Sequence, residues 1–539
     1  MKYFYIFIFV LIQFKAFSQQ IPTFVVQITV ENMRYEDIRR YWNKFSDSGF
    51  KKLVDSGIFF VNAHYNYLNI NSASGYATLS CGSYPSEHGI VGINWFDRIT
   101  NKNQNCVQDN NYKTLGVNTP GKSPSHINSL TWTDQLRLST FKMSKVYSVG
   151  MTDFASILVA GKLANAAFWF DVQSSNFVTS SFYQDSIKQW VKDFNNKKFA
   201  DIYLSKNWET TYEINKYIES LSDATSYEKG IAGQTTFPYN LSVLKNRFQN
   251  YSLLLYTPFS NTLVKDFAIN LVMNEYLGRD TYTDVLFVNF SAISYAEKFY
   301  SPKSVEIEDI FIKLDKDIAH LISFIESYVR KENVLFVLTS DKGSCQNTDW
   351  LNDININTGV LDPSKTILLS STYLRAIYGL EDWVIGFYNN QIYLNSFVID
   401  KNKISISEMQ QNCTKIVGSM TGVSVAIPTS KLFESSYSFG IMSKARNSYF
   451  ASRSGDLFLE LNYGWRYTTE ATDIANCTSS NNDNNHVPIV FYGSRIKKQT
   501  IYREVSMDEL GVTMSFLLNI PLPSNSTGKP LQEVLVNVQ

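Results

Sequence analysis

Histidine is scarce in this sequence, and net charge is absent. Only five histidines occur among 539 residues: His64, His88, His126, His320 and His486. A metal centre rich in imidazole ligands would need several of them to converge. The 49 Lys and Arg residues balance 49 Asp and Glu residues, so the chain has no excess of positive charge that would favour binding to nucleic acid or to an anionic membrane. We therefore expect no nucleic-acid partner.

Several common functional motifs are also missing. The sequence has no G-x-S-x-G elbow, Walker loop, G-x-G-x-x-G or H-E-x-x-H, which removes the usual signals of a serine hydrolase, a P-loop enzyme, a dinucleotide-binding enzyme and a zincin. No C-x-x-C pair occurs among the five cysteines, which are Cys81, Cys106, Cys345, Cys413 and Cys477. A thiolate zinc site is thus disfavoured, whereas an oxidising compartment would allow one or two disulfides. The odd number leaves at least one thiol unpaired within the chain.

The N-terminus has the pattern of a secretory signal. An apolar run follows an early lysine in "MKYFYIFIFVLIQFKAFSQQ", and Ala16 and Ser18 have the spacing of a cleavage site. We predict cleavage after Ser18, a mature chain over 19–539 without a membrane span, and a periplasmic or secreted location. The alternative is an uncleaved anchor, but Lys15 interrupts the apolar run.

The chain alternates buried strands with amphipathic helices. Five short apolar runs are candidate strands: 24–30, 145–151, 284–290, 334–340 and 487–493. Between the third and the fourth, apolar residues at helical spacing follow Ser304, a plausible N-cap. Strand, helix, strand indicates an α/β fold in which helices cover a parallel sheet.

Two regions fit this alternation poorly, at about 170–280 and 370–465. The first is rich in Tyr, Asn and Ser, and the second contains "DWVIGFYNNQIYLN" and "GDLFLELNYGW", which favour small antiparallel hairpins. We interpret both as cap insertions on one large domain.

The strand at 334–340 ends in a carboxylate, Asp341, directly followed by Lys342 and Gly343. Ligands in open α/β sheets gather at such strand ends. An ammonium group beside this aspartate is unusual, since many enzymes place a metal-binding histidine there.

Several longer stretches resemble the alkaline phosphatase superfamily in order and spacing. They are "NYLNINSASGYATLSCGSYPSEHGIVGINWFDR", "ASILVAGKLANAAFWFD", "SPKSVEIEDIFIKLDKDIAHL", "TSDKG", "HVPIVFYG" and "STGKPLQEVL". The likeness covers nearly the whole mature chain and is greatest to single-domain bacterial alkaline phosphatases, near the nucleotide pyrophosphatase/phosphodiesterase branch. It implies an alkaline-phosphatase-like sheet flanked by helices on both faces. It also implies two zinc ions about 4 Å apart that activate a Ser or Thr nucleophile.

The resemblance assigns a family role to each position of the site. The nucleophile position falls on Ser72 of "NINSASGY". Metal-ligand positions that keep a donor are Glu31, in place of the family's aspartate, Asp341 and His486. Three others carry residues that zinc does not favour at neutral pH: Ser294 and Lys298 in "SYAEK", and Lys342 in "DKG".

The phosphate-contact positions differ from the family as well. Thr152 and Phe154 stand in "MTDFASI" where the phosphomonoesterases carry a K-D-R-like pair. The family's asparagine falls on Ile93 or, with a shift of one residue, on Asn94.

Each of these residues also has a structural interpretation. Ser72 could cap a helix, and His486 could be a satisfied core histidine. His64, His88 and His320 are expected to be structural. Lysines at positions 298 and 342 could neutralise Glu31 and Asp341 in a closed ion-pair network, which would replace part of the lost metal charge.

Two hypotheses follow from the sequence. The main one is a pseudo-phosphatase without its di-zinc site, which needs no cofactor and acts by binding or assembly with an unknown periplasmic or envelope protein. The alternative is a zinc-dependent phosphomonoesterase or phosphodiesterase with an atypical site and Ser72 as nucleophile. Zinc content and phosphatase activity would distinguish them.

Overall fold

The structure is a computed structural model, and it describes residues 21–467, 480–493 and 495–538. The expected signal sequence and Cys477 lie outside these residues. Among the helices of the described part, none combines the length and the apolar character needed to cross a membrane.

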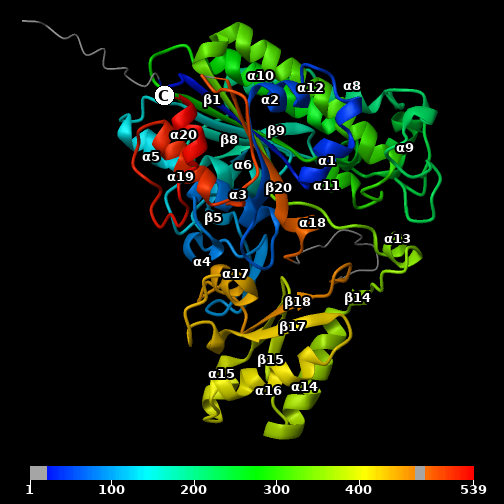
Figure 1. Cartoon of the computed structure of the whole chain (residues 1–539), viewed down its shortest axis with the longest axis vertical. Coiled ribbons are helices and arrows are strands. Elements are labelled where there is room, and N and C mark those ends of the chain that lie inside the picture. Colours follow the sequence, from blue (N-terminus) through cyan, green and yellow to red (C-terminus); the bar gives the residue numbers. More distant parts are fainter. Residues whose placement is uncertain (1–20, 468–479, 494, 539) are drawn as a thin grey trace, which may run out of the picture.

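One large mixed sheet forms the centre of the molecule (Figure 1). Its strand order is β21-β2-β20-β13-β1-β12-β7-β8-β9-β5-β6, with β22 beside β2. The strands are β1 (Phe24–Val30), β2 (Ile58–His64), β5 (Gln108–Leu115), β6 (Pro120–Lys122), β7 (Val146–Gly150), β8 (Ala166–Asp171), β9 (Asn176–Ser180), β12 (Asp284–Phe290), β13 (Val334–Thr339), β20 (His486–Gly493), β21 (Gln499–Ile501) and β22 (Val505–Ser506). All five runs expected to be strands from the sequence are therefore confirmed.

The centre of the sheet is parallel, as expected: β13, β1, β12, β7 and β8 all run in one direction. β20 departs from the expectation because it pairs antiparallel with both β13 and β2. A fully buried strand has the same continuous apolar composition in either direction, so the sequence could not reveal this reversal.

Helices cover both faces of the sheet, and each face has its own core. One face carries α1 (Tyr35–Arg40), α2 (Phe50–Ser56), α7 (Gln189–Asn196), α8 (Phe199–Leu204), α9 (Leu241–Leu244), α10 (Phe259–Glu275), α11 (Ala292–Ala296) and α12 (Val305–Val329). The other carries α3 (Ser72–Cys81), α5 (Trp132–Ser139), α6 (Asp153–Ala160), α19 (Glu509–Leu517) and α20 (Gln532–Val538). The Ser304 hydroxyl accepts a hydrogen bond from the Ile307 amide at 3.1 Å, which confirms the predicted cap of α12.

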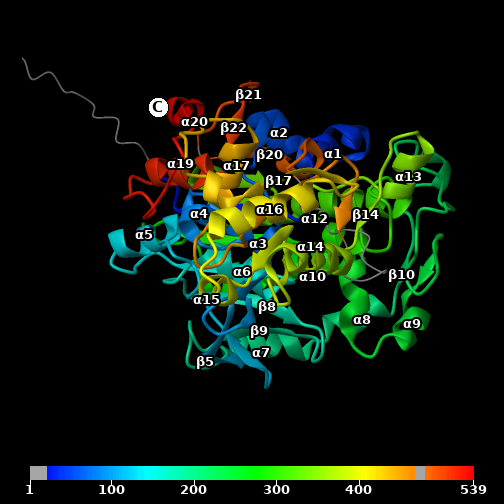
Figure 2. The same ribbon diagram turned by 90° about the horizontal axis from the view of Figure 1, so that it is seen from below.

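A second, smaller sheet lies below the first and is seen from its outer side in Figure 2. Its order is β15-β16-β18-β17, formed by Val384–Tyr388, Gln391–Leu394, Leu457–Leu461 and Val423–Pro428. β15 and β16 are the expected antiparallel hairpin. The helices α14 (Pro363–Tyr378) and α16 (Ile406–Gly418) pack on this sheet around a separate core, and the Arg98–Asp456 ion pair at 2.6 Å joins it to the main body.

Shorter elements connect these parts. They are α4 (Pro85–His88), α13 (Thr348–Asp353), α15 (Ser396–Lys401), α17 (Gly440–Ser448), α18 (Asn482–Asn485), and the strand pairs β3 (Asn94–Asp97) with β4 (Lys102–Asn105), β10 (Asn207–Trp208) with β11 (Tyr239–Asn240), and β14 (Val360–Leu361) with β19 (Arg466–Tyr467). Cys345 is disulfide-bonded. Cys81, Cys106 and Cys413 are buried free thiols.

Candidate functional site

The candidate site lies where β1, β12 and β13 end side by side. Parallel pairing of β1 with both neighbours brings the residues that follow these strands to one edge of the sheet. Hydrogen bonds fix the turns together, since the Asn32 amide donates to Asp341 Oδ1 at 3.0 Å and the Ser340 hydroxyl donates to the Val30 carbonyl at 2.6 Å. The structure thus brings Glu31, Asp341 and Ser294 together as expected.

Glu31 is buried, and hydroxyl groups bind both of its carboxylate oxygens. Oε1 accepts from Tyr76 at 3.1 Å and from Ser291 at 3.0 Å, and Oε2 accepts from Ser294 at 2.7 Å. Burial and the nearby negative charge of Asp341 raise the pKa of Glu31 to about 7, although the three hydroxyls oppose the shift. A ring of neutral donors therefore surrounds this carboxyl group.

Asp341 is fully buried beside the start of α3. Burial raises its pKa, and the charge of Lys342 and the Ser72 hydroxyl partly offset that effect. Oδ1 accepts a hydrogen bond from the Asn32 amide, and the Lys342 backbone amide also stabilises the carboxylate. The carboxylate is thus only partly compensated.

Ser72 is the first residue of α3, and it does not cap the helix. Asn71 is the N-cap, because its side chain accepts from the Ser74 amide at 3.0 Å. The structural interpretation of Ser72 as a cap is therefore wrong. With only 8% of its surface exposed, Ser72 lies next to Asp341, which is where a nucleophile of this fold is expected.

Gly75 allows α3 to approach the turn after β13 closely. A Cβ atom at this position would lie 1.9 Å from the Asp341 carbonyl oxygen. This residue therefore sets the distance between the helix that carries Ser72 and the strand end that carries Asp341.

A third buried carboxyl group, Glu297, was missed by the sequence reasoning. Its Oε2 accepts from the Asn32 side chain at 2.6 Å and from the Ser344 hydroxyl at 2.7 Å. Burial raises its pKa to about 7, although the charges of Arg34 and Lys342 act in the opposite direction. The signal was its place in "SYAEK", directly before Lys298, a position that the resemblance assigns to a metal ligand.

The expected closed ion-pair network is not formed. Lys298 is exposed, and its ammonium group lies 5.0 Å from the centre of the Tyr295 ring. Lys342 is buried, but its Nζ donates to the Gly343 carbonyl at 3.1 Å and contacts neither Glu31 nor Asp341 within 4 Å among the described residues. Serine and tyrosine hydroxyls are therefore the groups that bind Glu31, and Lys342 acts on Asp341 through its charge and its backbone amide.

His486 belongs to a stack of rings at the start of β20. Its Nε2 is 2.8 Å from the Val61 carbonyl oxygen, and its ring lies between those of Tyr35, at 4.7 Å, and His64, at 4.5 Å. His64 is itself bonded on both nitrogens, to Asn62 and Asn485. Both imidazoles thus have structural partners.

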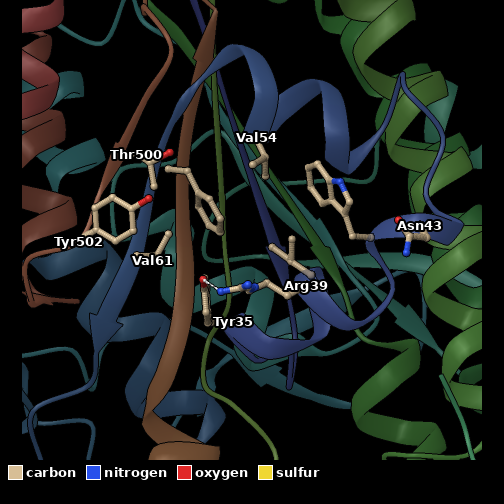
Figure 3. Close-up of a pocket in the computed structure, with 10 residues that line it drawn as sticks. Tyr35, Arg39, Asn43, Val54, Val61, Thr500 and Tyr502 are labelled. Atoms are coloured by element: carbon tan, nitrogen blue, oxygen red, sulfur yellow. Dashed lines mark hydrogen bonds between the residues drawn. The ribbon is translucent and has the colours of Figure 1, made fainter.

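Tyr35 also lines a groove of about 470 Å³ on the far side of this stack, between α1, α2 and the edge strand β21. Figure 3 shows Tyr35 and Arg39 joined by a hydrogen bond of 3.4 Å at one side of the groove, opposite Tyr502. The groove contains no acidic residue. It therefore does not extend the carboxyl cluster.

The remaining histidines have structural surroundings or lie on the surface. His88 is buried against Thr78, with its Nε2 3.2 Å from the hydroxyl oxygen, and burial lowers its pKa to about 3. His126 lies 3.0 Å from the Gln104 side chain. His320 is exposed on α12.

The phosphate-contact positions present no positive charge. Thr152 precedes α6 with a buried hydroxyl that has no partner in the described structure. Phe154 packs against Tyr76, with ring centres 6.3 Å apart, and so forms an apolar wall near Glu31. Asn94 is exposed and accepts from Asn105 at 3.2 Å, while Ile93 is half-buried.

Within the described ranges, no three His, Cys, Asp or Glu side chains are placed so that they could hold one metal ion. Glu31 and Asp341 are close, but a serine, an exposed lysine and a buried lysine stand at three of the four other positions that the resemblance assigns to ligands, and the fourth, His486, directs its Nε2 at the Val61 carbonyl. The donor set therefore does not suit a pair of zinc ions.

The fold is that of the α/β phosphoester hydrolases related to alkaline phosphatase, and the comparisons with known proteins agree with it. Residues 25–486 match the type I phosphodiesterase / nucleotide pyrophosphatase family, and the chain belongs to this family. The resemblance to the alkaline phosphatase superfamily is thereby confirmed.

Two of the similar proteins are alkaline phosphatases by name. PafA of Elizabethkingia meningoseptica is 32% identical over 526 residues, covering 95% of this chain and 94% of that protein. PhoV of Synechococcus elongatus is 31% identical over 534 residues, covering 97% and 95%. The crystal structure of wild-type PafA superimposes with a TM-score of 0.90 at 30% identity, covering 95% of this chain and 99% of that one.

Proposed function

We propose that this protein is a pseudo-phosphatase: an alkaline-phosphatase-fold protein that has lost its di-zinc site and acts by binding or assembly. The observation that carries the proposal is the set of hydroxyls around Glu31. A carboxylate that bound zinc would direct its oxygens at the metal, whereas here Tyr76, Ser291 and Ser294 occupy both oxygens.

The other former ligand positions support the same conclusion. The ammonium group of Lys298 lies in solvent beside Tyr295, and His486 directs its Nε2 at a backbone carbonyl. Neither side chain would reach a metal without rotating out of its present contacts.

Phosphoryl transfer also needs positive charge around the transferred group. Thr152 and Phe154 supply none, and Lys342 already faces the negative charges of Asp341 and Glu297. The site therefore has little capacity to stabilise a phosphate dianion.

A second candidate function is a metal-dependent phosphomonoesterase or phosphodiesterase. Ser72 favours it, because this hydroxyl lies at the start of a buried helix next to a partly compensated Asp341. The names of the relatives favour it as well. Zinc would then supply the Lewis acid, and Ser72 would be the nucleophile.

A periplasmic or secreted location is part of the proposal. It is supported by the pattern of the N-terminal sequence and by the disulfide at Cys345. The partner we infer is another protein of the same compartment. The chain has a folded surface, but its net charge is zero, and so it has no excess of positive charge for binding nucleic acid.

Hydrolysis of p-nitrophenyl phosphate by the purified protein, with and without added zinc, tests the proposal. We expect the wild type to be no faster than a Ser72→Ala variant. A zinc-dependent rate that disappears in Ser72→Ala, but survives in a Ser80→Ala control on the same helix, would establish the second function instead.

A further inference from the structure

The helix α14, which packs on the smaller sheet, has an exposed apolar face. Leu368 and Leu369 are 64% and 49% exposed, and Leu380, which follows shortly after the end of the helix, is 92% exposed. Residues 366–374 carry no charged side chain. Single exposed leucines are common on soluble proteins, but several of them on one helix form a patch, and such patches mark interaction surfaces.

Small side chains lie between the leucines of this face. Thr372 and Ala376 follow Leu368 at intervals of four residues, so the three side chains lie on one side of the helix, and all three are exposed. The Thr372 hydroxyl donates to the Leu368 carbonyl at 2.8 Å and therefore needs no partner from outside the helix. The opposite side of α14, with Ser370 and Leu374, is buried. The exposed side is thus apolar in its central part.

The order of the side chains along this face is the same from either end. Leu368, Thr372, Ala376 and Leu380 read large, small, small, large. A two-fold interface uses the same patch on both subunits, so the patch must be complementary to itself. If a second α14 packs antiparallel, Thr372 of each copy meets Ala376 of the other, and the leucines close both ends. Small residues at the centre allow the two helices to approach closely.

The charges at the two ends of the face complement each other in the same antiparallel arrangement. Lys365 is exposed in the first turn of α14, whereas Asp362 is engaged as the N-cap and accepts the Ser364 and Lys365 amides. At the other end, Asp382 is exposed beside Arg375, at 2.5 Å. An antiparallel pair brings Lys365 of each copy towards Asp382 of the other, whereas a parallel pair would place two Lys365 side chains together.

A lipid surface fits this face less well than a second copy does. Apolar helix faces that lie on membranes are usually bordered by Lys and Arg, which bind anionic lipids. Here Glu381 and Asp382 stand at one end of the face. Their negative charge would oppose binding to an anionic lipid surface.

We propose that the α14 face, formed by Leu368, Leu369, Thr372, Ala376 and Leu380, joins two copies of this chain in an antiparallel helix pair. The helix has 16 residues and is therefore about 24 Å long. In Figure 1 it lies in the lower part of the molecule, below the large sheet. One face of such a helix buries less than the roughly 800 Å² per partner of a typical stable complex, so the dimer forms reversibly.

This association goes beyond the proposed function, because it would hold for a pseudo-phosphatase and for an active phosphoesterase alike. The phosphatase assay and the mass measurement below therefore give independent answers.

The test is sedimentation equilibrium of the purified protein from about 1 μM to about 100 μM, the range in which a weak dimer dissociates. We expect the wild type to form a dimer that dissociates on dilution. Leu368→Glu places a charge in the apolar face and should be monomeric throughout. Its melting temperature at the lowest concentration should equal that of the wild type, because Leu368 is exposed in the monomer. The control Ile99→Glu changes an exposed apolar residue of the main body and should dimerise like the wild type.

Charge reversal tests the antiparallel direction. Lys365→Glu should weaken the dimer at least tenfold, because like charges then meet at both ends of the helix pair. Addition of Asp382→Lys to the same chain should restore the dimer. A dimer that Lys365→Glu leaves unchanged would overturn the antiparallel arrangement.

Three other results would overturn the proposal as a whole. The first is a wild type that stays monomeric at every concentration, which would leave the face for a different protein. The second is a dimer that persists in Leu368→Glu, which would place the interface elsewhere. The third is a monomeric wild type that binds vesicles of phosphatidylglycerol and phosphatidylethanolamine, with loss of binding in Leu368→Glu, which would identify a lipid surface as the occupant.

Discussion

The substitution Glu31→Gln distinguishes two interpretations of Glu31. In the first, Glu31 is a carboxyl group held by hydroxyls, and in the second it is a metal ligand. Glu31 is buried, no cation among the described residues contacts it, and its pKa rises from an ordinary value near 4.5 to about 7. Gln has nearly the same shape and does not ionise. The substitution therefore removes a charge while it keeps the packing against Tyr76 and Ser294.

The magnitude follows from linkage between proton binding and folding. Between pH 4.5 and 7, the unfolded chain releases the Glu31 proton while the folded chain retains it, so stability falls as the pH rises. Each unit of pKa difference corresponds to about 1.4 kcal/mol, which gives a loss of about 3 kcal/mol by pH 8. Glu31→Gln should abolish this loss.

The assay is chemical unfolding of wild type and Glu31→Gln at pH 5 and at pH 8. We expect the variant to be more stable than the wild type at pH 8, by at most about 3 kcal/mol, and nearly equal to it at pH 5. Glu332→Gln, at an exposed position, is the control for a change of charge alone. A Glu31→Gln variant that is less stable at pH 8, or that loses a stabilisation by zinc present in the wild type, would refute the reasoning.

Three further predictions concern the same edge of the sheet. Gly75→Ala should destabilise the fold by several kcal/mol in chemical unfolding, although Ala is the better helix former by about 1 kcal/mol, because its Cβ would collide with the Asp341 carbonyl oxygen; a stabilised variant would contradict the close approach. Lys342→Ala should destabilise the fold by clearly less than the roughly 3 kcal/mol of a broken buried ion pair, since Lys342 forms no such pair with the described residues. A larger loss of stability would support the ion-pair network instead. The last prediction is for a variant that combines Glu31→Asp, Ser294→Asp, Lys298→His and Lys342→His. Elemental analysis should find zinc in it, but it should hydrolyse p-nitrophenyl phosphate slowly, because Thr152 and Phe154 add no positive charge. Full activity would show that the phosphate-contact positions matter less than we infer.

Much of the fold could be predicted from local patterns. The buried strands are continuous apolar runs, and the cap of α12 follows from Ser304 before an amphipathic helix. Those patterns depend on neighbours in the sequence. The direction of β20 depends on neighbours in space, and so it became evident only from its pairing with β13.

The candidate site shows the same division. Alignment with family motifs brought Glu31, Ser72 and Asp341 to one place, because the ends of adjacent parallel strands must meet. The motifs could not show that the Lys298 side chain lies outside the site, just after a short helix. They also could not show that the neighbouring Glu297 lies inside it. Tyr76 could have been found, since it is the last residue of the stretch "NINSASGY" that carries Ser72, and its hydroxyl donates to Glu31.

The central claim is that the former di-zinc site no longer binds zinc. Elemental analysis of the purified protein, after incubation with excess zinc and removal of unbound metal, tests it most directly. We predict no stoichiometric zinc, both in the wild type and in Glu31→Gln. Zinc near two ions per chain in the wild type, and its loss in Glu31→Gln, would contradict the claim and identify Glu31 as a metal ligand.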